Sequence, residues 1–290
     1  MEELTIIIPA YNEEKSLEKY LPEVLSFCEN NNYKLITIND GSKDKTMEVL
    51  LAHANQKSFF TIVNHKLNKG YGGAIKSGIE NAVTKYVVTI DADGQHNLND
   101  VTSILNYCKL NDADMVVGSR KGQASTTYRS IGKWIIRKTA ATLMPLPIYD
   151  LNSGLKLYNT ELAQKYIKLC PNNMAYSDVI ALVYISQRHR VLEKEITINK
   201  RIAGESTIST KTAIDTIREI VNIVVLFNPM RIFIPLSILF ILASTAWGLP
   251  IILQGKGVSV GAMLGIITGI IFFVLGLIAE QISLLRKQNI

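Results

Sequence analysis

Two aspartates follow a short apolar run about a third of the way along the chain. They lie in the string Asp91-Ala92-Asp93-Gly94-Gln95, directly after Tyr86–Ile90. If the extended conformation continues past this run, alternation places both carboxylates on the same side. Paired carboxylates suit Mg²⁺ or Mn²⁺, which would bridge a diphosphate and neutralise charge on a departing group, and Gln95 could add a neutral oxygen. Taken alone, the pattern is as typical of aspartates in a solvated turn.

Alternating strand and helix patterns surround this motif. β-rich apolar segments recur between Leu4 and about Gly118, separated by stretches with helical spacing. The segments are Leu4–Ile8, Leu35–Ile38, Phe59–Val63, Tyr86–Ile90 and Met115–Val117. This alternation predicts an α/β fold with a mostly parallel sheet and flanking helices. Ligands bind at the carboxyl ends of strands in such sheets, so the loops beginning at Tyr11, Asp40 and Asp91 are the expected site.

Two uncharged segments near the C-terminus predict a membrane anchor. Ile232–Leu253 and Val258–Ala279 contain no Asp, Glu, Lys or Arg. At about 1.5 Å per residue each spans roughly 30 Å, the thickness of a hydrocarbon core, although a pair of buried soluble helices is the alternative. Basic residues flank the pair at Arg218, Arg231, Arg286 and Lys287. The positive-inside rule then predicts a cell-membrane protein with two spans and both termini in the cytoplasm.

An amphipathic pattern precedes the first span. Its apolar stripe is Ala213, Ile214, Ile217, Ile220, Val221, Val224 and Val225. The pattern predicts either a helix at the membrane interface or a helix packed on the preceding domain. The expected organisation is a cytoplasmic domain over residues 1–210, an amphipathic interfacial helix over 211–231 and a two-helix transmembrane anchor over 232–290.

The net charge and the cysteine spacing bear on nucleic-acid binding, zinc sites and disulfides. The net charge of +6 comes from dispersed lysines and arginines, and a basic surface beside anionic lipid explains it at least as well as nucleic acid does. The charge alone decides nothing, and the expected partners include a lipid bilayer and no nucleic acid. Cys28, Cys108 and Cys170 lack the spacing of a zinc site or a disulfide framework.

Four strings occur in a fixed order along the first third of the chain. They are Ile6–Glu14 (IIPAYNEE), Ile38–Asp44 (INDGSKD), Asn68–Ala74 (NKGYGGA) and the Asp91 motif. Their order and spacing resemble glycosyltransferase family 2. The resemblance implies a GT-A fold, which is a Rossmann-like nucleotide-binding α/β domain whose Asp-x-Asp holds Mg²⁺ or Mn²⁺ against the diphosphate of a nucleotide sugar.

Three further strings resemble the dolichyl- and undecaprenyl-phosphate sugar transferases of that family, of the dolichyl-phosphate mannosyltransferase type. They are Gly118-Ser119-Arg120, Asp150–Gly154 (DLNSG) and Arg201–Ser206 (RIAGES). The resemblance implies nucleotide-sugar contacts for Pro9, Tyr11, Glu13, Ile38, Asp40 and Ala92. It implies metal and donor contacts for Asp91, Asp93 and Gln95. It implies phosphate contacts for Arg120, Arg129 and Arg201, since guanidinium forks bind phosphate bidentately.

Each string also has a purely structural interpretation. Asn12 could cap a helix with Glu13 in its first turn. Asp40-Gly41-Ser42 could be an ordinary turn, and Asn68–Gly73 an ordinary glycine-rich loop. Arg129 could be a surface residue.

Departures from the family pattern affect individual contacts. Asn39 stands where aspartate is frequent, Leu155-Lys156 where Phe-Arg is common, and Thr207 where a lysine is usual. The last departure puts one phosphate contact in doubt, and Lys211 could replace it.

The expected reaction is transfer of a hexose to a polyprenyl phosphate with inversion. The acceptor oxygen is already anionic near neutral pH, so positioning and charge neutralisation should dominate. Asp178 could orient the acceptor or act as a base. Alternatives are a different acceptor, such as a glycolipid or a polysaccharide, and a catalytically silent scaffold of the same fold. The absence of a Gln-x-x-Arg-Trp string disfavours a processive synthase. Donor base and sugar are not readable, and a homo-oligomer is a further expectation from Gly261, Gly265 and Gly269.

Overall fold

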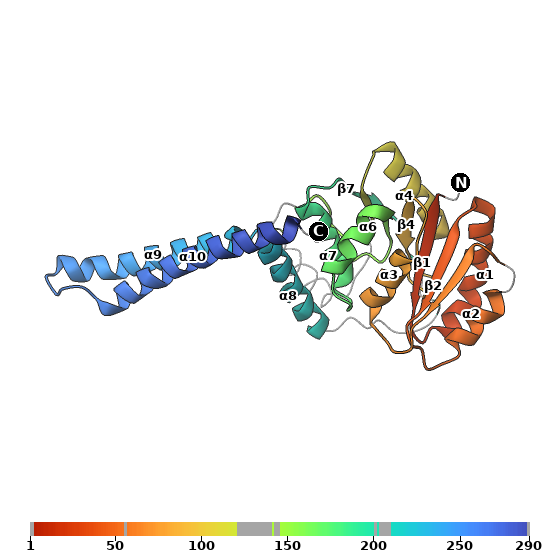
Figure 1. Ribbon diagram of the computed structural model, residues 1–290, viewed down its shortest axis with the longest axis horizontal. Helices are drawn as coiled ribbons and strands as arrows, with labels where there is room; N and C mark the ends of the chain where they lie inside the picture. Colours follow the sequence, from red (N-terminus) through yellow and green to blue (C-terminus); the bar gives the residue numbers. More distant parts are fainter. Residues whose placement is uncertain are drawn as a thin grey trace. The chain divides into compact units, whose positions relative to one another are not determined.

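A computed structural model describes residues 3–54, 57–120, 141, 146–199, 202 and 210–288. The chain divides into two compact units between Glu219 and Ile220. The N-terminal unit is an α/β domain, and the C-terminal unit contains a helical hairpin (Figure 1). Arg129 and Arg201 lie outside the described residues, as does the side chain of Lys211.

Within the described residues, seven strands form one sheet in the order β3-β2-β1-β4-β6-β5-β7. The strands are β1 (Leu4–Ala10), β2 (Lys34–Asn39), β3 (Phe60–Asn64), β4 (Tyr86–Thr89), β5 (Met115–Ser119), β6 (Lys156–Asn159) and β7 (Val191–Glu195). All neighbours run parallel except β6, which is antiparallel to both β4 and β5. The prediction of a mostly parallel sheet is confirmed. The strand order reverses at β1 and β4, where open sheets of this kind bind ligands.

Helices cover both faces of the sheet (Figure 1). The helices of the α/β unit are α1 (Glu14–Asn31), α2 (Thr46–Ala54), α3 (Tyr71–Glu80), α4 (Leu98–Leu110), α6 (Thr160–Tyr166) and α7 (Tyr176–Ser186), with a 3-10 turn η1 (Ile167–Leu169). Because strand side chains alternate, Ile6 and Ile8 join the core under α1 and α4, while Ile7 meets α3 on the other face. The close approach of α3 depends on Gly78, since a Cβ there would lie 2.5 Å from Ile7 Cγ2.

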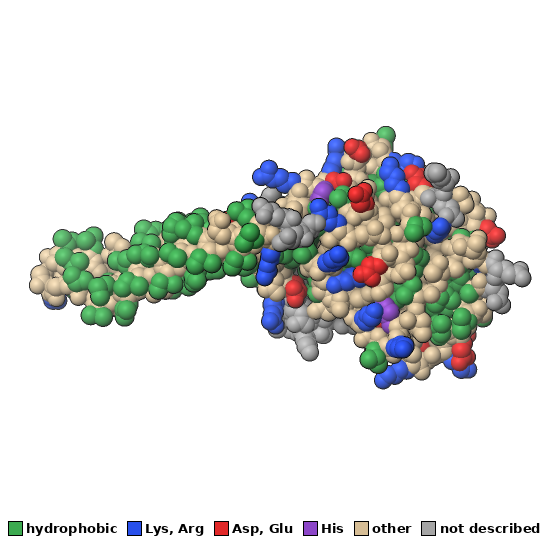
Figure 2. All heavy atoms as spheres, viewed as in Figure 1, with side chains coloured by type: hydrophobic (Ala, Val, Ile, Leu, Met, Phe, Trp, Pro, Cys, Tyr) green, Lys and Arg blue, Asp and Glu red, His purple; other side chains and the backbone are tan. Residues whose placement is uncertain are grey.

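Two long apolar helices form the C-terminal hairpin. They are α9 (Met230–Leu253) and α10 (Val260–Gln288), and both are long and apolar enough to cross a membrane. Hydrophobic side chains cover most of the hairpin surface (Figure 2), including exposed Leu242, Trp247 and Leu264. An exposed apolar surface of this extent is typical of a membrane segment. The structure therefore confirms the prediction of two helices that could span a membrane.

Two glycines of α10 pack against α9 within this hairpin. A Cβ on Gly265 would overlap Ser244 Oγ, and one on Gly269 would lie 2.6 Å from Ile241 Cγ1, so both glycines let α9 approach closely. The Gly-x-x-x-Gly spacing therefore has a partner in the same chain. These glycines give no support to contact with a second copy, and a homo-oligomer stays a prediction.

A pair of alanine substitutions tests this packing. Gly265→Ala is expected to lower hairpin stability by about 1–3 kcal/mol, because the added methyl group has no space. Gly261→Ala is the matched control on the same helix, since its Cβ would make an ordinary 3.4 Å contact with the Trp247 ring. Thermal unfolding in detergent should show a lower midpoint for the first variant alone. Equal midpoints would contradict the packing described.

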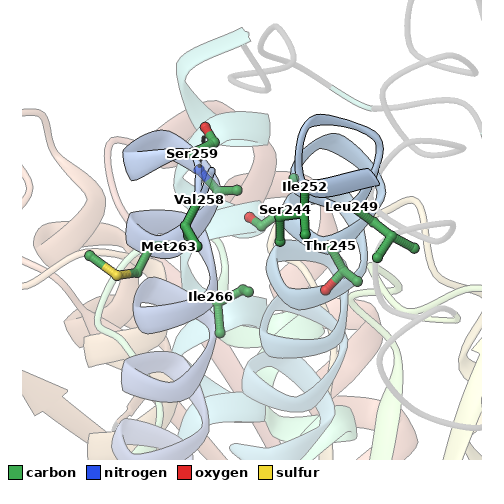
Figure 3. Close-up of a pocket in the computed structure, with 10 residues that line it drawn as sticks. Ser244, Thr245, Leu249, Ile252, Val258, Ser259, Met263 and Ile266 are labelled. Atoms are coloured by element: carbon green, nitrogen blue, oxygen red, sulfur yellow. Dashed lines mark hydrogen bonds between the residues drawn. The ribbon is translucent and has the colours of Figure 1, made fainter. Parts of the chain in front are cut away.

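The two helices leave a cleft of about 160 Å³ near their connecting turn (Figure 3). Ser244 and Thr245 from α9, Ser259 directly before α10 and Met263 from α10 line it, with apolar neighbours. None of its lining residues is charged. A nucleotide diphosphate needs cationic or metal partners, so this cleft is unsuited to the donor.

The helix that precedes the hairpin is α8 (Thr210–Phe227). In its described half, Ile220, Ile223, Val224 and Phe227 are buried. Packing of this helix on the preceding domain stays a prediction. The location of residues 211–231 at a membrane interface stays a prediction.

Candidate active site

The loops after β1 and β2 are joined by hydrogen bonds. The backbone N–H of Asn12 donates to Ser42 Oγ at 3.0 Å, and the N–H of Lys43 donates to Asn12 Oδ1 at 2.8 Å. Asn12 has a left-handed φ of 56°, and the residue before α1 is Glu13. The helix-cap interpretation of Asn12 is therefore wrong, because its side chain binds the neighbouring loop instead. Tyr11 remains 43% exposed beside this junction, where its ring is free to stack on a base.

Asp40 joins the second string to the third. Its buried carboxylate accepts hydrogen bonds from the N–H groups of Lys69 and Gly70 at 2.8 and 2.9 Å. Its Oδ1 lies 2.6 Å from His65 Nδ1, and His65 Nε2 lies 2.9 Å from Ser77 Oγ. The structure thus gives Asp40 an internal task, which is to hold the glycine loop in place. Its predicted contact with a ribose hydroxyl is not tested by these bonds and stays a prediction.

Tyr71 joins the third string to the fourth. It begins α3, and its hydroxyl donates to Asp91 Oδ1 at 3.1 Å. Burial and the adjacent Asp91 charge raise the pKa of the Tyr71 phenol well above its usual value, so the hydroxyl stays protonated and keeps donating. All four strings are therefore linked by hydrogen bonds from the end of β1 to Asp91.

Asp91 is held in its ionised form. Burial opposes this, but hydrogen bonds from His96 and Tyr71 and the positive charge of Arg120 outweigh it, so the pKa of Asp91 lies below its usual range. His96 Nε2 lies 3.3 Å from Asp91 Oδ2, and the His96 ring is almost wholly buried. The buried His96 ring therefore contacts the Asp91 carboxylate through Nε2. The Asp91 side chain is 34% exposed, so it can reach a ligand.

Asp93 reaches the site by a turn. β4 ends at Thr89, and residues 92–93 form a turn, so the extended conformation assumed for alternating side chains does not persist. Asp93 Oδ1 accepts a hydrogen bond from the N–H of Gln95 at 3.0 Å, and the Asp93 carbonyl accepts one from the N–H of Ile202 at 3.0 Å. The turn, and not strand alternation, sets the direction of this carboxylate.

Gly154 leaves room beside Asp91. A Cβ at this position would overlap Asp91 Oδ2. Within the described residues, no cluster of three or more His, Cys, Asp or Glu side chains could hold a metal alone. An ionised, part-exposed Asp91 nevertheless fits a hard divalent cation, because Mg²⁺ takes one or two carboxylates and completes its shell with water and substrate phosphates.

Gly154→Ala should therefore displace the Asp91 carboxylate. A displacement of about 1 Å in an active site can cost about a hundredfold in rate, so we expect turnover to fall about 10- to 100-fold. The measurement is kcat together with the thermal midpoint. A loss of activity at an unchanged midpoint would support the crowding described, and full activity would contradict it.

Arg120 is fixed by a bidentate pair. Its Nε donates to Asp150 Oδ2 at 2.7 Å and its Nη2 to Asp150 Oδ1 at 2.8 Å, and Nη2 also donates to the Asn152 carbonyl at 2.7 Å. Burial disfavours the guanidinium charge, but the Asp150 and Asp91 carboxylates outweigh it and raise the pKa of Arg120 above its usual value. Arg120 follows β5 and keeps 27% of its side chain exposed, so it can contact an anion.

The remaining predicted residues are placed around this group. Pro9 lies in β1 and Ile38 in β2, Ala92 lies in the turn between the two aspartates, and Glu13 precedes α1 with its N–H donating to Thr46 Oγ1 at 2.9 Å. Asp178 lies buried in the first turn of α7. His65, Gly154 and Lys156 were not predicted as site residues. Lys156 carried a signal as a departure from the family pattern, whereas His65 carried none.

Residues 5–167 match Glycosyl transferase family 2, which is more than half of the chain, and residues 228–285 match the GtrB C-terminal hairpin. The chain belongs to glycosyltransferase family 2. The second match coincides with α9 and α10.

Curated relatives of this family 2 chain include polyprenyl-phosphate sugar transferases. A dolichyl-phosphate beta-glucosyltransferase of Trichomonas vaginalis is 30% identical, covering 74% of this chain and 72% of the relative. An undecaprenyl-phosphate 4-deoxy-4-formamido-L-arabinose transferase of Aeromonas hydrophila is 27% identical, covering 70% and 62%. An uncharacterized protein of Methanocaldococcus jannaschii is 30% identical over 74% of this chain and 88% of its own length.

Solved structures support the GT-A fold of this family 2 chain. Glucosyl-3-phosphoglycerate synthase of Mycobacterium tuberculosis, in complex with Mn²⁺, uridine diphosphate and phosphoglyceric acid, has a TM-score of 0.59 at 16% identity. The similarity covers 77% of this chain and 78% of the other. The same enzyme was also crystallised with Mg²⁺ and uridine diphosphate, with a TM-score of 0.57 at 15% identity and coverage of 77% and 79%. At these identities the likeness establishes the fold alone.

Proposed function

We propose that this family 2 chain is an inverting glycosyltransferase that moves a hexose from a nucleotide-diphosphate sugar to a polyprenyl phosphate at the cytoplasmic membrane face. The observation that carries the proposal is the series of hydrogen bonds that runs from Asn12 through Asp40 and Tyr71 to Asp91. This series connects an exposed aromatic ring at one end with an ionised carboxylate at the other. A nucleotide base would stack on the aromatic ring, and a divalent ion held by the carboxylate would bind the diphosphate.

The donor would lie along this series. Tyr11 would stack on the base, with Pro9, Glu13, Ile38 and Asp40 contributing the other predicted contacts. Asp91, Asp93 and Gln95 would hold Mg²⁺ or Mn²⁺ through their side-chain oxygens. The low pKa of Asp91 keeps its carboxylate ionised, and the turn at residues 92–93 orients that of Asp93. A bound divalent ion supplies charge neutralisation for the departing nucleotide diphosphate.

The acceptor side needs cations more than a base. A phosphate oxygen is already a competent nucleophile near neutral pH, so its position decides the rate. Arg120 is held rigidly by Asp150 through Nε and Nη2, so its contact with a phosphate would come from Nη1. Arg129 and Arg201 are expected to add phosphate contacts, with Lys211 in place of the missing lysine. Asp178 would orient the acceptor.

Two features support a polyprenyl phosphate as the acceptor. Named relatives act on dolichyl and undecaprenyl phosphates. The chain also ends in an apolar hairpin, which would hold the catalytic unit beside the lipid. Basic flanks at Arg218, Arg231 and Arg286 would place that unit on the cytoplasmic side.

The test compares two acceptors that differ only in phosphate. Detergent-solubilised protein is incubated with a nucleotide sugar and either polyprenyl phosphate or the corresponding polyprenol, and products are identified by mass spectrometry and nuclear magnetic resonance. We expect a glycosyl phosphate with inverted anomeric configuration from the first acceptor alone. Retention would overturn single displacement, and transfer to polyprenol would overturn the acceptor class. Binding of nucleotide sugar without any turnover would favour the silent scaffold.

A further inference from the structure

A lysine lies buried at the first position of β6, between two neighbouring strands. Lys156 is 1% exposed in β6, between Thr89 of β4 and Val117 of β5. Lysine is almost never buried to this extent unless its charge is compensated, because desolvation of an ammonium group is costly. Its place in the fold therefore requires a reason.

The Lys156 ammonium group donates hydrogen bonds to two serines. Its Nζ donates to the Ser153 carbonyl at 2.5 Å and makes a short hydrogen bond to Ser177 Oγ. Ser177 Oγ in turn donates to the same Ser153 carbonyl at 2.8 Å. The three residues form a closed set of hydrogen bonds between the segment before β6 and the first turn of α7.

Both bound segments carry site residues. Ser153 lies between Asp150, which fixes Arg120, and Gly154, which borders Asp91. Ser177 directly precedes Asp178. We propose that Lys156 is a positioning residue for sugar transfer, whose ammonium group fixes the segment 150–154 against α7 and thereby sets Arg120 and Asp91. This inference rests on the proposed function.

The charges around Lys156 give the inference a measurable signature. Burial disfavours its charge, while Asp178 from α7, Asp150 and Asp91 favour it and Arg120 opposes it, so the pKa of Lys156 is lowered to about 8. The ammonium form therefore dominates at neutral pH and is lost in mild alkali. An arginine at this position stays charged throughout that range.

The test is the pH dependence of kcat/KM for wild type, Lys156→Arg and Lys156→Met, with Lys19→Arg as an exposed control on α1. Wild type and control should lose activity above about pH 8, by about tenfold per pH unit. Lys156→Arg should keep its activity to about pH 10. Lys156→Met should lie about a hundredfold below the neutral-pH value of wild type and show no alkaline limb. An alkaline limb shared by wild type and Lys156→Arg, a folded but inactive Lys156→Arg, or an active Lys156→Met would overturn the proposal.

Hydrogen–deuterium exchange separates this inference from the proposed reaction. The backbone N–H of Arg120 donates to Asp150 Oδ2 at 3.2 Å. The backbone N–H of Asp150 donates to Glu193 Oε1 at 2.7 Å. Lys156→Met should speed exchange at both, and Lys156→Arg should not. If wild type transfers no sugar, this exchange still decides whether Lys156 fixes the segment. Unchanged exchange in Lys156→Met would contradict the inference whatever the reaction.

Discussion

Asp93→Asn is expected to lower sugar transfer by about a thousandfold or more, because a divalent metal contributes several kcal/mol to charge stabilisation and each 1.4 kcal/mol is about tenfold in rate. Asparagine keeps the shape of the side chain and can still accept the hydrogen bond from the N–H of Gln95. The turn should therefore survive, and only the charge is lost. The measurement is kcat at saturating donor with the thermal midpoint recorded in parallel.

Asp112→Asn is the matched control for this charge change. Asp112 is exposed in a turn with φ of 47°, a conformation that asparagine adopts readily. Its substitution should change neither turnover nor midpoint. Full turnover in Asp93→Asn would show that the metal assignment is wrong.

Asp150→Ala should damage both stability and activity. It removes both acceptors of the Arg120 fork and leaves a guanidinium group that is largely buried without its partner. Breaking a buried pair costs about 3–5 kcal/mol, and the partial exposure of Arg120 places this case near about 3 kcal/mol. Transfer should fall about a hundredfold as the guanidinium loses its fixed position. Thermal unfolding and steady-state kinetics measure the two losses.

A surface pair in the same domain supplies the comparison. Lys109 Nζ lies 3.0 Å from Glu3 Oε2, with side chains 46% and 35% exposed. Exposed pairs contribute little to stability because solvent screens them, so Lys109→Ala should leave stability and transfer nearly unchanged. Equal effects of the two substitutions would contradict the role given to the Arg120–Asp150 pair.

The fold class was readable from local patterns. Apolar segments of strand length alternated with helical spacing, and the resulting sheet is parallel except at β6. β6 and β7 were not predicted as strands, because Lys156 and the charged residues of Val191–Glu195 break the apolar pattern on which the strand prediction depended.

The order of the family strings predicted where the site lies but not how it is held. Asp91 and Arg120 could be selected from their strings, whereas the bonds that fix them come from residues distant in sequence, such as His65 with Asp40 and Gly154 beside Asp91. Local propensity was also misleading at Asn12, where a tertiary bond to the N–H of Lys43 replaced a helix cap. Contacts of this kind depend on the packed sheet, and residue spacing alone does not encode them.

Metal-dependent labelling of lipid tests the proposed function as a whole. Detergent-solubilised protein is given polyprenyl phosphate, Mg²⁺ or Mn²⁺, and each of a panel of radiolabelled nucleotide sugars, and a chelator replaces the metal in the control. We expect one donor to label the organic-extractable lipid with metal and none to do so with chelator. Labelling that is unaffected by the chelator would contradict the metal site, and no labelling with any donor would contradict polyprenyl phosphate transfer.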